Sequence, residues 1–371
     1  MTARMGCSRW RRCAQVAFLL SVLLLLIGCT LMRGEPTAGF VYSPSICYTG
    51  QSVEFDASAS TGSGDDITSY AWQFGDGTVA QGRVVYHTFT RAREHLVELT
   101  ITTSGGSTAT ASRQVLIQSA LVVPSAYTTI QAAIDAASDG DTVLVLPGTY
   151  TESLRIMEKN ITVRSSDPDS SVIVRTTTIR GSEYGRPTIS LGGGTTATVE
   201  GFTIRPGPDD LISGPCDACA GMVYIREAAP TIRLNRILDS PKSGIGIYES
   251  KAHIEFNTIS GNSSASNKTT GGGIYVDSFR VAPIITGNTF QNNTASTGGG
   301  ISINATAPTT VSAAAAAATI VSGNEFTSNV ALDGYGGAIF VEYTGNLRLD
   351  TPDSNTYTGN GSSPVHYIVP P

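Results

Sequence analysis

Charged residues are scarce in this chain of 371 residues, at 15%, and basic residues are the minority among them. Hydrophobic residues make up 40% of the chain. They are enough to bury a core, which excludes a wholly disordered protein. The formal net charge of −6 becomes −10 once the four arginines of residues 1–28 are left out. Because this acidic body lacks the basic face that nucleic acids require, no nucleic-acid partner is expected. The length favours two domains plus appendages.

The amino terminus has the pattern of an export signal. An apolar run from Ala14 to Ile27 is too short to span a bilayer comfortably but suits the core of a signal peptide. It ends in Leu26-Ile27-Gly28-Cys29, which resembles the lipobox of bacterial lipoproteins. The resemblance implies a signal peptide at 1–28 and a lipidated Cys29 that begins a tether at 29–35. The chain would then be exported and anchored by lipid, at the cell surface or in the periplasm of a bacterium. An ordinary signal peptide or signal anchor is the alternative.

Few cysteines remain beyond this signal. In an export compartment the spacing of Cys216 and Cys219 suits a local disulfide. The pair follows Gly214-Pro215 in a loop rather than a strand, which disfavours a redox dithiol, and no second ligand pair is spaced for zinc. Cys47 has no obvious partner.

The segment 36–118 is predicted to form a small antiparallel β-sandwich, because short alternating runs are broken by glycine- and serine-rich turns. Its centre, Trp72-Gln73-Phe74-Gly75-Asp76-Gly77 with His87-Thr88-Phe89 further on, resembles the PKD domain, an immunoglobulin-like module of extracellular proteins. We expect Trp72 and Phe74 to be buried, Asp76 to stabilise the tight turn, and His87 to be a structural hydrogen-bonding partner. The resemblance implies a spacer or a weak binding module, not an enzyme.

A second domain, 120–365, opens with an amphipathic helix. Apolar residues recur on one helical face, at Ile130, Ala133, Ile134 and Ala137. The stretch from Tyr127 to Glu152 resembles the start of pectin-lyase-like, right-handed parallel β-helices, in which such a helix caps the first coil. A cap covers the apolar core and the strand edge that this coil would otherwise expose.

Two interleaved repeats predict stacked coils. Glycine-rich segments recur with an aliphatic anchor, which we place at Val223, Ile247, Ile274, Ile301 and Ile339. Between them lies a row of asparagines, each followed two residues later by Ile, Phe or Tyr: Asn235, Asn257, Asn288, Asn324 and Asn355. We interpret each coil as two short parallel strands, with coils about 4.8 Å apart. The asparagines should form a buried amide ladder above stacked apolar residues.

The predicted fold class is therefore all-β. It consists of an immunoglobulin-like β-sandwich followed by a right-handed parallel β-helix with an N-terminal amphipathic capping helix.

The catalytic signatures of pectin-lyase-like enzymes are missing. The paired catalytic segments of pectinesterases have no match, and neither do the calcium-binding aspartates of pectate lyases or the aspartate pattern of polygalacturonases. We predict that any catalytic residues lie in one column of side chains along the β-helix. The column is formed by the residues three positions after each anchor: Arg226, Ser250, Asp277, Asn304 and Glu342. The candidate catalytic residues are Asp277, Glu342 and Arg280, and Asn304 is a candidate binding residue. Carboxylates held close together raise one pKa or bind calcium, which suits acid–base or lyase chemistry on an acidic sugar.

A loop from Pro206 to Ala220 is a second candidate, because loops on a rigid scaffold often carry function. Its candidate binding residues are Asp209, Asp210 and Asp217.

Three functions remain open. The first is a surface lipoprotein whose β-helix binds glycan or protein without catalysis, with the PKD domain as spacer. The second is a polysaccharide lyase, hydrolase or epimerase, and the third is a structural or adhesive envelope component. The missing signatures favour the first. The expected partners are a polysaccharide or cell-envelope glycan and, through the lipid, a membrane. No cofactor is predicted, although calcium would suit the carboxylate column.

Overall fold

The computed structural model describes residues 34–182, 186–207, 221–264, 271–278, 281–305, 319–343, 354–360 and 363–368. Its contacts divide the chain into two units, with the main boundary after Ile117. Among the described residues, no helix has both the length and the apolar character needed to cross a membrane.

The first unit consists of two antiparallel sheets. One has the order β1 (Val41–Ser43), β3 (Ser52–Asp56), β6 (Val84–Thr88). The other has the order β2 (Cys47–Tyr48), β8 (Thr108–Gln118), β7 (Arg93–Thr103), β4 (Ile67–Gln73), β5 (Val79–Gln81). Their inner residues form one aromatic core, in which Trp72 and Phe74 are 1% exposed, as predicted.

The turn after Phe74 is held by its own side chains. Gly75 has a positive φ of 71°, and a Cβ there would lie 2.6 Å from the carbonyl oxygen of Leu96, so only glycine fits. The Asp76 carboxylate accepts a hydrogen bond from the backbone N–H of Thr78 at 3.0 Å and lies 2.8 Å from Nε2 of His87. The sequence-based roles of Asp76 and His87 agree with these contacts.

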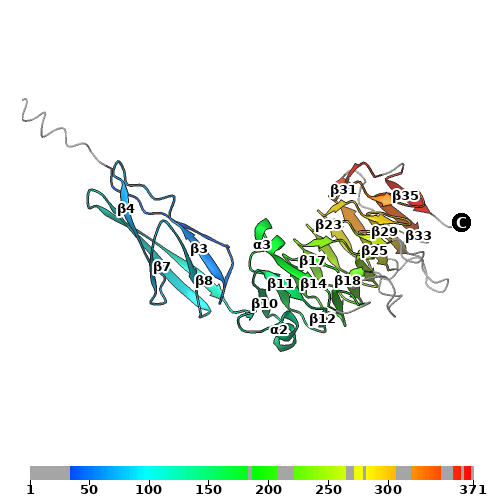
Figure 1. Cartoon of the computed structure of the whole chain (residues 1–371), viewed down its shortest axis with the longest axis horizontal. Helices are drawn as coiled ribbons and strands as arrows, with labels where there is room; N and C mark the ends of the chain where they lie inside the picture. The colour runs from blue at the N-terminus through cyan, green and yellow to red at the C-terminus, as the bar shows by residue number, and fades with distance from the viewer. Residues whose placement is uncertain are drawn as a thin grey trace, which may run out of the picture. The chain divides into compact units, whose positions relative to one another are not determined.

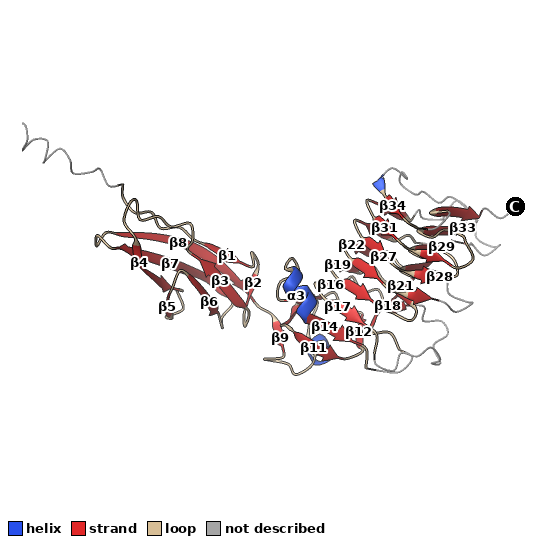
Figure 2. Ribbon diagram, turned by 45° about the horizontal axis from the view of Figure 1, so that its top comes forward, coloured by secondary structure: helices blue, strands red, loops and turns tan. Residues whose placement is uncertain are grey.

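The second unit is built from three long parallel sheets, which we call sheets I, II and III (Figures 1 and 2). Sheet I contains β9 (Leu121–Val123), β10 (Thr142–Val145), β13 (Thr162–Ser165), β16 (Thr198–Glu200), β19 (Thr231–Arg233), β22 (His253–Glu255), β26 (Ile284–Thr286) and β30 (Ile320–Ser322). Sheet II contains β11 (Gly148–Thr151), β14 (Thr177–Arg180), β17 (Thr203–Arg205), β20 (Arg236–Leu238), β23 (Thr258–Ser260), β27 (Thr289–Gln291), β31 (Glu325–Thr327) and β34 (Thr356–Thr358).

Sheet III contains β12 (Leu154–Met157), β15 (Ile189–Gly192), β18 (Gly221–Arg226), β21 (Ser243–Tyr248), β25 (Ile274–Asp277), β29 (Ile301–Ala305), β33 (Ile339–Tyr343) and β35 (Val365–Ile368). A small further sheet joins β24 (Ser263–Ser264), β28 (Thr294–Ala295) and β32 (Val330–Ala331). A coil thus contributes one strand to each long sheet, so the expectation of two strands per coil was wrong. Three-residue strands are too short to stand out as separate alternating runs in the sequence.

Successive coils stack identical kinds of side chain in the core. In sheet II the inward row includes Ile237, Ile259, Phe290 and Phe326, all fully buried. The rings of Phe290 and Phe326 are parallel within 6°, with centroids 4.8 Å apart. In sheet III the anchor of β21 is Ile245, which pairs with both Val223 and Ile274. The prediction of Ile247 as that anchor was wrong by two residues, because alternation makes both isoleucines inward-facing.

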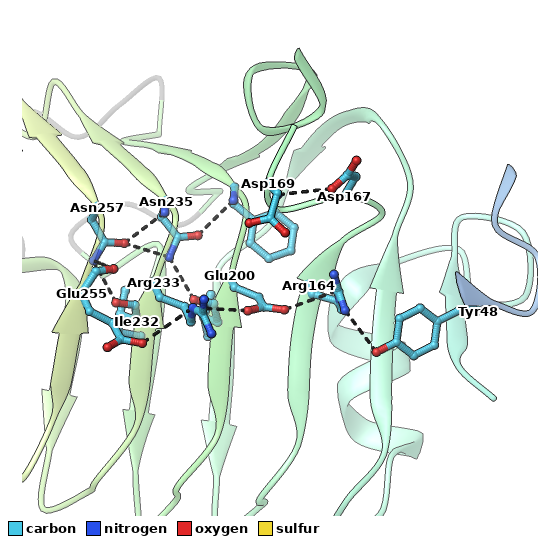
Figure 3. Close-up of polar contacts among 12 residues, drawn as sticks. Tyr48, Arg164, Asp167, Asp169, Glu200, Ile232, Arg233, Asn235, Glu255 and Asn257 are labelled. Carbon is cyan, nitrogen blue, oxygen red and sulfur yellow. Dashed lines mark hydrogen bonds and ion pairs between the residues drawn. The ribbon is translucent and has the colours of Figure 1, made fainter. Parts of the chain in front are cut away.

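The predicted asparagine ladder is present, and Figure 3 shows its first two members, Asn235 and Asn257. The ladder runs through Asn235, Asn257, Asn288, Asn324 and Asn355, and the side-chain amide of each of the first four donates to Oδ1 of the next asparagine at 2.9–3.2 Å. A second ladder, which the sequence-based interpretation missed, runs through Asn262, Asn293, Asn329 and Asn360. Its sequence signal is an Asn five residues after a member of the first ladder, on four successive coils.

Helix α2 (Ile130–Ala136) packs against β9, β10 and β12 and contributes Ile130, Ala133 and Ile134 to the core of the second unit. The Glu152 carboxylate accepts hydrogen bonds from the first backbone N–H groups of α2, at 3.0 and 2.9 Å. Lys159 Nζ donates to three carbonyls at its other end. Opposite charges therefore stabilise the two ends of the helix dipole.

Candidate functional site

The candidate site is the outward face of sheet III, where side chains of successive coils form two neighbouring columns. Strand alternation creates it: Val223 and Ile225 of β18 are fully buried in the core, while Tyr224 and Arg226 point outward. Strands β18, β21, β25, β29 and β33 lie side by side in that order (Figures 1 and 2).

Three tyrosines lie in contact along this face. The ring of Tyr248 on β21 lies 5.2 Å from the ring of Tyr224 on β18 and 5.9 Å from the ring of Tyr275 on β25. Tyr224 and Tyr248 are half-buried, and Tyr275 is 9% exposed. The sequence-based interpretation named the anchors of the repeats that contain these tyrosines but not the tyrosines themselves. Their signal is a Tyr next to an aliphatic residue in three consecutive copies of the repeat.

Polar residues continue the second column. Asp277, Asn304 and Glu342 are direct register partners on β25, β29 and β33. Asp277 and Asn304 are half-buried, and Glu342 is exposed. Three of the predicted residues thus lie on consecutive rungs, as the periodicity indicated.

Ser250 does not belong to this column. The register partner of Asp277 on β21 is Tyr248, and Tyr248 in turn pairs with Arg226. Ser250 lies in the following turn, buried, and its hydroxyl donates to the Tyr248 carbonyl at 2.6 Å. The displacement follows from the misplaced anchor at Ile247.

The electrostatics of the face centre on Asp277. Burial and the nearby Glu249 carboxylate both raise the pKa of Asp277. Burial also raises the pKa of Tyr275, as do the charges of Asp277 and Glu342, whereas its hydrogen bond with Asn304 lowers it. A carboxyl group beside a phenol offers a hydrogen-bond acceptor and a donor that a sugar hydroxyl can match.

Several predicted residues lie outside the described part of the chain. They are the lipidation residue Cys29, the disulfide pair Cys216 and Cys219, the loop residues Asp209, Asp210 and Asp217, and Arg280. Cys47 is buried and its thiol lies 3.2 Å from the Pro44 carbonyl; burial raises the pKa of this thiol to about 11.

No group of three or more His, Cys, Asp or Glu side chains that could hold a metal ion occurs within the described ranges. Calcium therefore stays a prediction. What the face offers chemically is a set of aromatic rings beside hydrogen-bonding groups. Such a surface can contact the C–H side of a sugar ring and its hydroxyls together.

The two halves of the chain match two family models. The model described as PKD domain matches residues 34–117, and the model described as right handed beta helix region matches residues 163–368, more than half of the chain.

Solved structures resemble each part. The PKD1 domain of Vibrio anguillarum Epp is 29% identical over 24% of this chain and 98% of that domain, with a TM-score of 0.21. Rice weevil pectin methyl esterase is 14% identical over 65% of this chain and 88% of the esterase, with a TM-score of 0.36. A structure of carbohydrate-binding modules from the beta-sandwich superfamily is 23% identical over 29% of this chain, with a TM-score of 0.24. This chain spans only 38% of that protein's length.

Proposed function

Since the chain belongs to the right-handed β-helix family, whose coils repeat the same outward positions on every rung, we propose that the outer face of sheet III binds a glycan chain without cleaving it. The observation that carries the proposal is the contact of Tyr224, Tyr248 and Tyr275 beside the column of Asp277, Asn304 and Glu342. Because Tyr224 and Tyr248 are half-buried and Tyr275 is 9% exposed, these rings lose little side-chain freedom on binding. The adjacent polar groups give the ligand a defined orientation.

Glycan-array screening of the exported chain, followed by calorimetric titration of the best ligand, tests this proposal. Tyr248→Ala removes the central ring and should weaken binding at least tenfold, or about 1.4 kcal/mol. Tyr248→Phe keeps the ring and serves as the matched control, so it should retain most of the affinity. Equal affinities for Tyr248→Ala and the parent protein, or no glycan bound at all, would contradict the proposal.

Acid–base catalysis on an acidic polysaccharide is the second candidate function. It is favoured by the raised pKa of Asp277, which suits a general acid, and by Tyr275 and Asn304 next to it. The assay measures the absorbance of unsaturated sugar products, and released reducing ends, with calcium added. If the protein cleaves the polysaccharide and Asp277→Ala abolishes this activity, the function is enzymatic rather than binding alone. Silence in both the binding and the turnover assays would favour a structural or adhesive envelope component.

Export and lipid anchoring at Cys29 belong to the same proposal, with the PKD domain as a spacer between the anchor and the β-helix. The support is the apolar run that ends in Leu26-Ile27-Gly28-Cys29. Metabolic labelling with a fatty-acid analogue should mark the protein in the membrane fraction, and Cys29→Ala should abolish the label. A labelled Cys29→Ala variant would contradict lipidation at this residue.

A further inference from the structure

Four arginines gather on the outer side of sheet II and the adjoining helix α3 (Ser171–Thr176); we call Arg175, Arg180, Arg205 and Arg236 the arginine patch. Arg180 and Arg205 are direct register partners on β14 and β17. Arg236 lies on the next strand, β20, where its register partner is Thr203, so it stands two residues before the column of Arg180 and Arg205. Its neighbour Ile237 pairs with Ile204 in the core and turns Arg236 outward.

Helix α3 adds the fourth arginine. The Thr203 hydroxyl on β17 donates to the Val174 carbonyl at 2.8 Å, which fixes the last turn of α3 against sheet II. Arg175 follows Val174 and is exposed. Burial lowers the pKa of Arg236, and the positive charges of Arg175 and Arg205 lower it further, against the opposing charge of Asp239. Arg236 is therefore within electrostatic range of Arg175 and Arg205, and Arg180 joins the patch through its register with Arg205.

The patch is poorly neutralised within the described part of the chain. Arg205 pairs with Asp239, but no carboxylate lies within ion-pair distance of Arg175, Arg180 or Arg236 among the residues described. Arg180 Nε instead donates to the Pro206 carbonyl at 3.2 Å.

Sheet I of the same coils shows the opposite arrangement (Figure 3). There Glu200 lies 3.3 Å from Arg164 and 3.7 Å from Arg233, and Arg233 lies 3.7 Å from Glu255, so the charges alternate from rung to rung. The coils can thus accommodate arginine columns with paired carboxylates. Sheet II and α3 instead gather arginines of which, among the residues described, Arg205 alone has an ion pair, on an otherwise acidic body. This arrangement points to an anionic ligand that supplies the missing charge.

We propose that the arginine patch binds the acidic groups of a polyanionic polysaccharide that runs along the stacked coils. Guanidinium groups match carboxylate and sulfate oxygens with paired hydrogen bonds. Register places Arg180 and Arg205 side by side on successive rungs, which are about 4.8 Å apart, and Arg236 on the third rung, two residues before that column. Arginines spread over three rungs suit a chain of repeated anions better than a single small anion. The site lies on sheet II and the tyrosines lie on sheet III, so this proposal does not rest on the glycan-binding function given above, and either can fail alone.

The test is calorimetric titration of the full chain with size-defined polygalacturonate oligosaccharides, with dextran oligosaccharides as the uncharged probe. Binding of polygalacturonate should weaken as salt is raised, and dextran should not compete for the patch. Arg180→Gln and Arg236→Gln should each weaken binding about tenfold. Lys251→Gln removes one exposed charge elsewhere on the same unit and should change the affinity less than twofold. Circular dichroism establishes that each variant is folded.

A variant that is expected to tighten binding provides a further test. Asp239→Asn removes the carboxylate that competes for Arg205 and should tighten binding several-fold; asparagine tolerates the positive φ of 60° at this position. Unchanged affinity in both arginine variants, or weaker binding in Asp239→Asn, would overturn the proposal. So would binding to phosphatidylglycerol vesicles but not to polygalacturonate, because the patch would then be a lipid-headgroup site.

Discussion

The side chain of Asn257 is hydrogen-bonded to Oδ1 of Asn288 on the next coil at 2.9 Å, and the backbone N–H of Asn257 reaches the same oxygen at 2.9 Å. The side-chain oxygen of Asn288 thus accepts hydrogen bonds from both the backbone N–H and the side-chain amide of Asn257. Asn288 repeats the arrangement with Asn324 and also donates to the Ile254 carbonyl at 2.8 Å. Each member from Asn235 to Asn324 thus holds three coils together.

Removing one member should therefore be costly. Asn288→Ala leaves the Ile254 carbonyl and the Asn257 N–H buried without their partner, and we expect a loss of about 2–4 kcal/mol in the free energy of unfolding. Urea unfolding followed by far-UV circular dichroism measures it. Gln291→Ala, an exposed change on the adjoining strand, is the control and should cost less than about 0.5 kcal/mol. Equal stability of the two variants would show that the ladder is dispensable.

The third glycine of a triplet makes room for a core ring. A Cβ on Gly300 would lie 2.5 Å from the Ala338 carbonyl oxygen and 2.7 Å from the ring of Phe326. Gly300→Ala should lower the stability of the second unit by about 1–3 kcal/mol, measured by calorimetry. Phe326→Leu in the same chain should recover part of the loss if the ring is the main obstacle. Gly39→Ala is the control, because its nearest neighbour would be 3.8 Å away.

Asp277 should make stability depend on pH. Its pKa is raised in the folded state, so the folded protein binds the proton more tightly than the unfolded chain does. The stabilising effect of protonation is complete below the ordinary aspartate pKa and is lost as the pH rises through the raised value. Asp277→Asn should therefore melt a few degrees higher than the parent at pH 7, with no difference in strong acid. Thermal melts across pH measure this, and Glu342→Gln is the control. A lower melting temperature at pH 7 would contradict the assignment.

Asp76 should make the stability of the first unit depend on pH in the opposite direction. Burial raises its pKa, but hydrogen bonds from Thr78 and the contact with His87 outweigh this and lower the pKa to about 2. The stability that the carboxylate confers is present above the ordinary aspartate pKa and is lost as the pH falls toward 2. Asp76→Asn should lower the melting temperature of the first unit by about 4–8 °C at pH 7, with the difference shrinking in acid.

Tryptophan fluorescence isolates this transition. In a chain that starts at Thr30, Trp72 is the sole tryptophan, and it lies in the core of the first unit. Asp66→Asn, an exposed change in the same unit, should leave the melting temperature within about 2 °C. Equal melting temperatures of Asp76→Asn and the parent protein at pH 7 would contradict the stabilising role of the Asp76 carboxylate.

The stacking of coils and the first asparagine ladder could be predicted from the sequence. Each coil repeats the same environment, so Asn235, Asn257 and Asn288 recur beside apolar residues that fill the same inward row. The column of Asp277, Asn304 and Glu342 followed from the same periodicity. The prediction of Ile247 as an anchor was wrong because Ile245 and Ile247 of β21 both face the core. The sequence does not show which of the two pairs with Ile274.

What the sequence determined by itself is the repeat: a residue's position within a coil decides whether it faces the core, a turn or solvent, because strand alternation and stacking act on every coil alike. What only the tertiary structure decided is which distant residues share a surface. Coils differ in length, so the distance in sequence between neighbours such as Arg180 and Arg205, or Tyr224 and Tyr248, carries no fixed period. Register across the rungs brings these side chains together, and register is set by the packing of whole coils against one another.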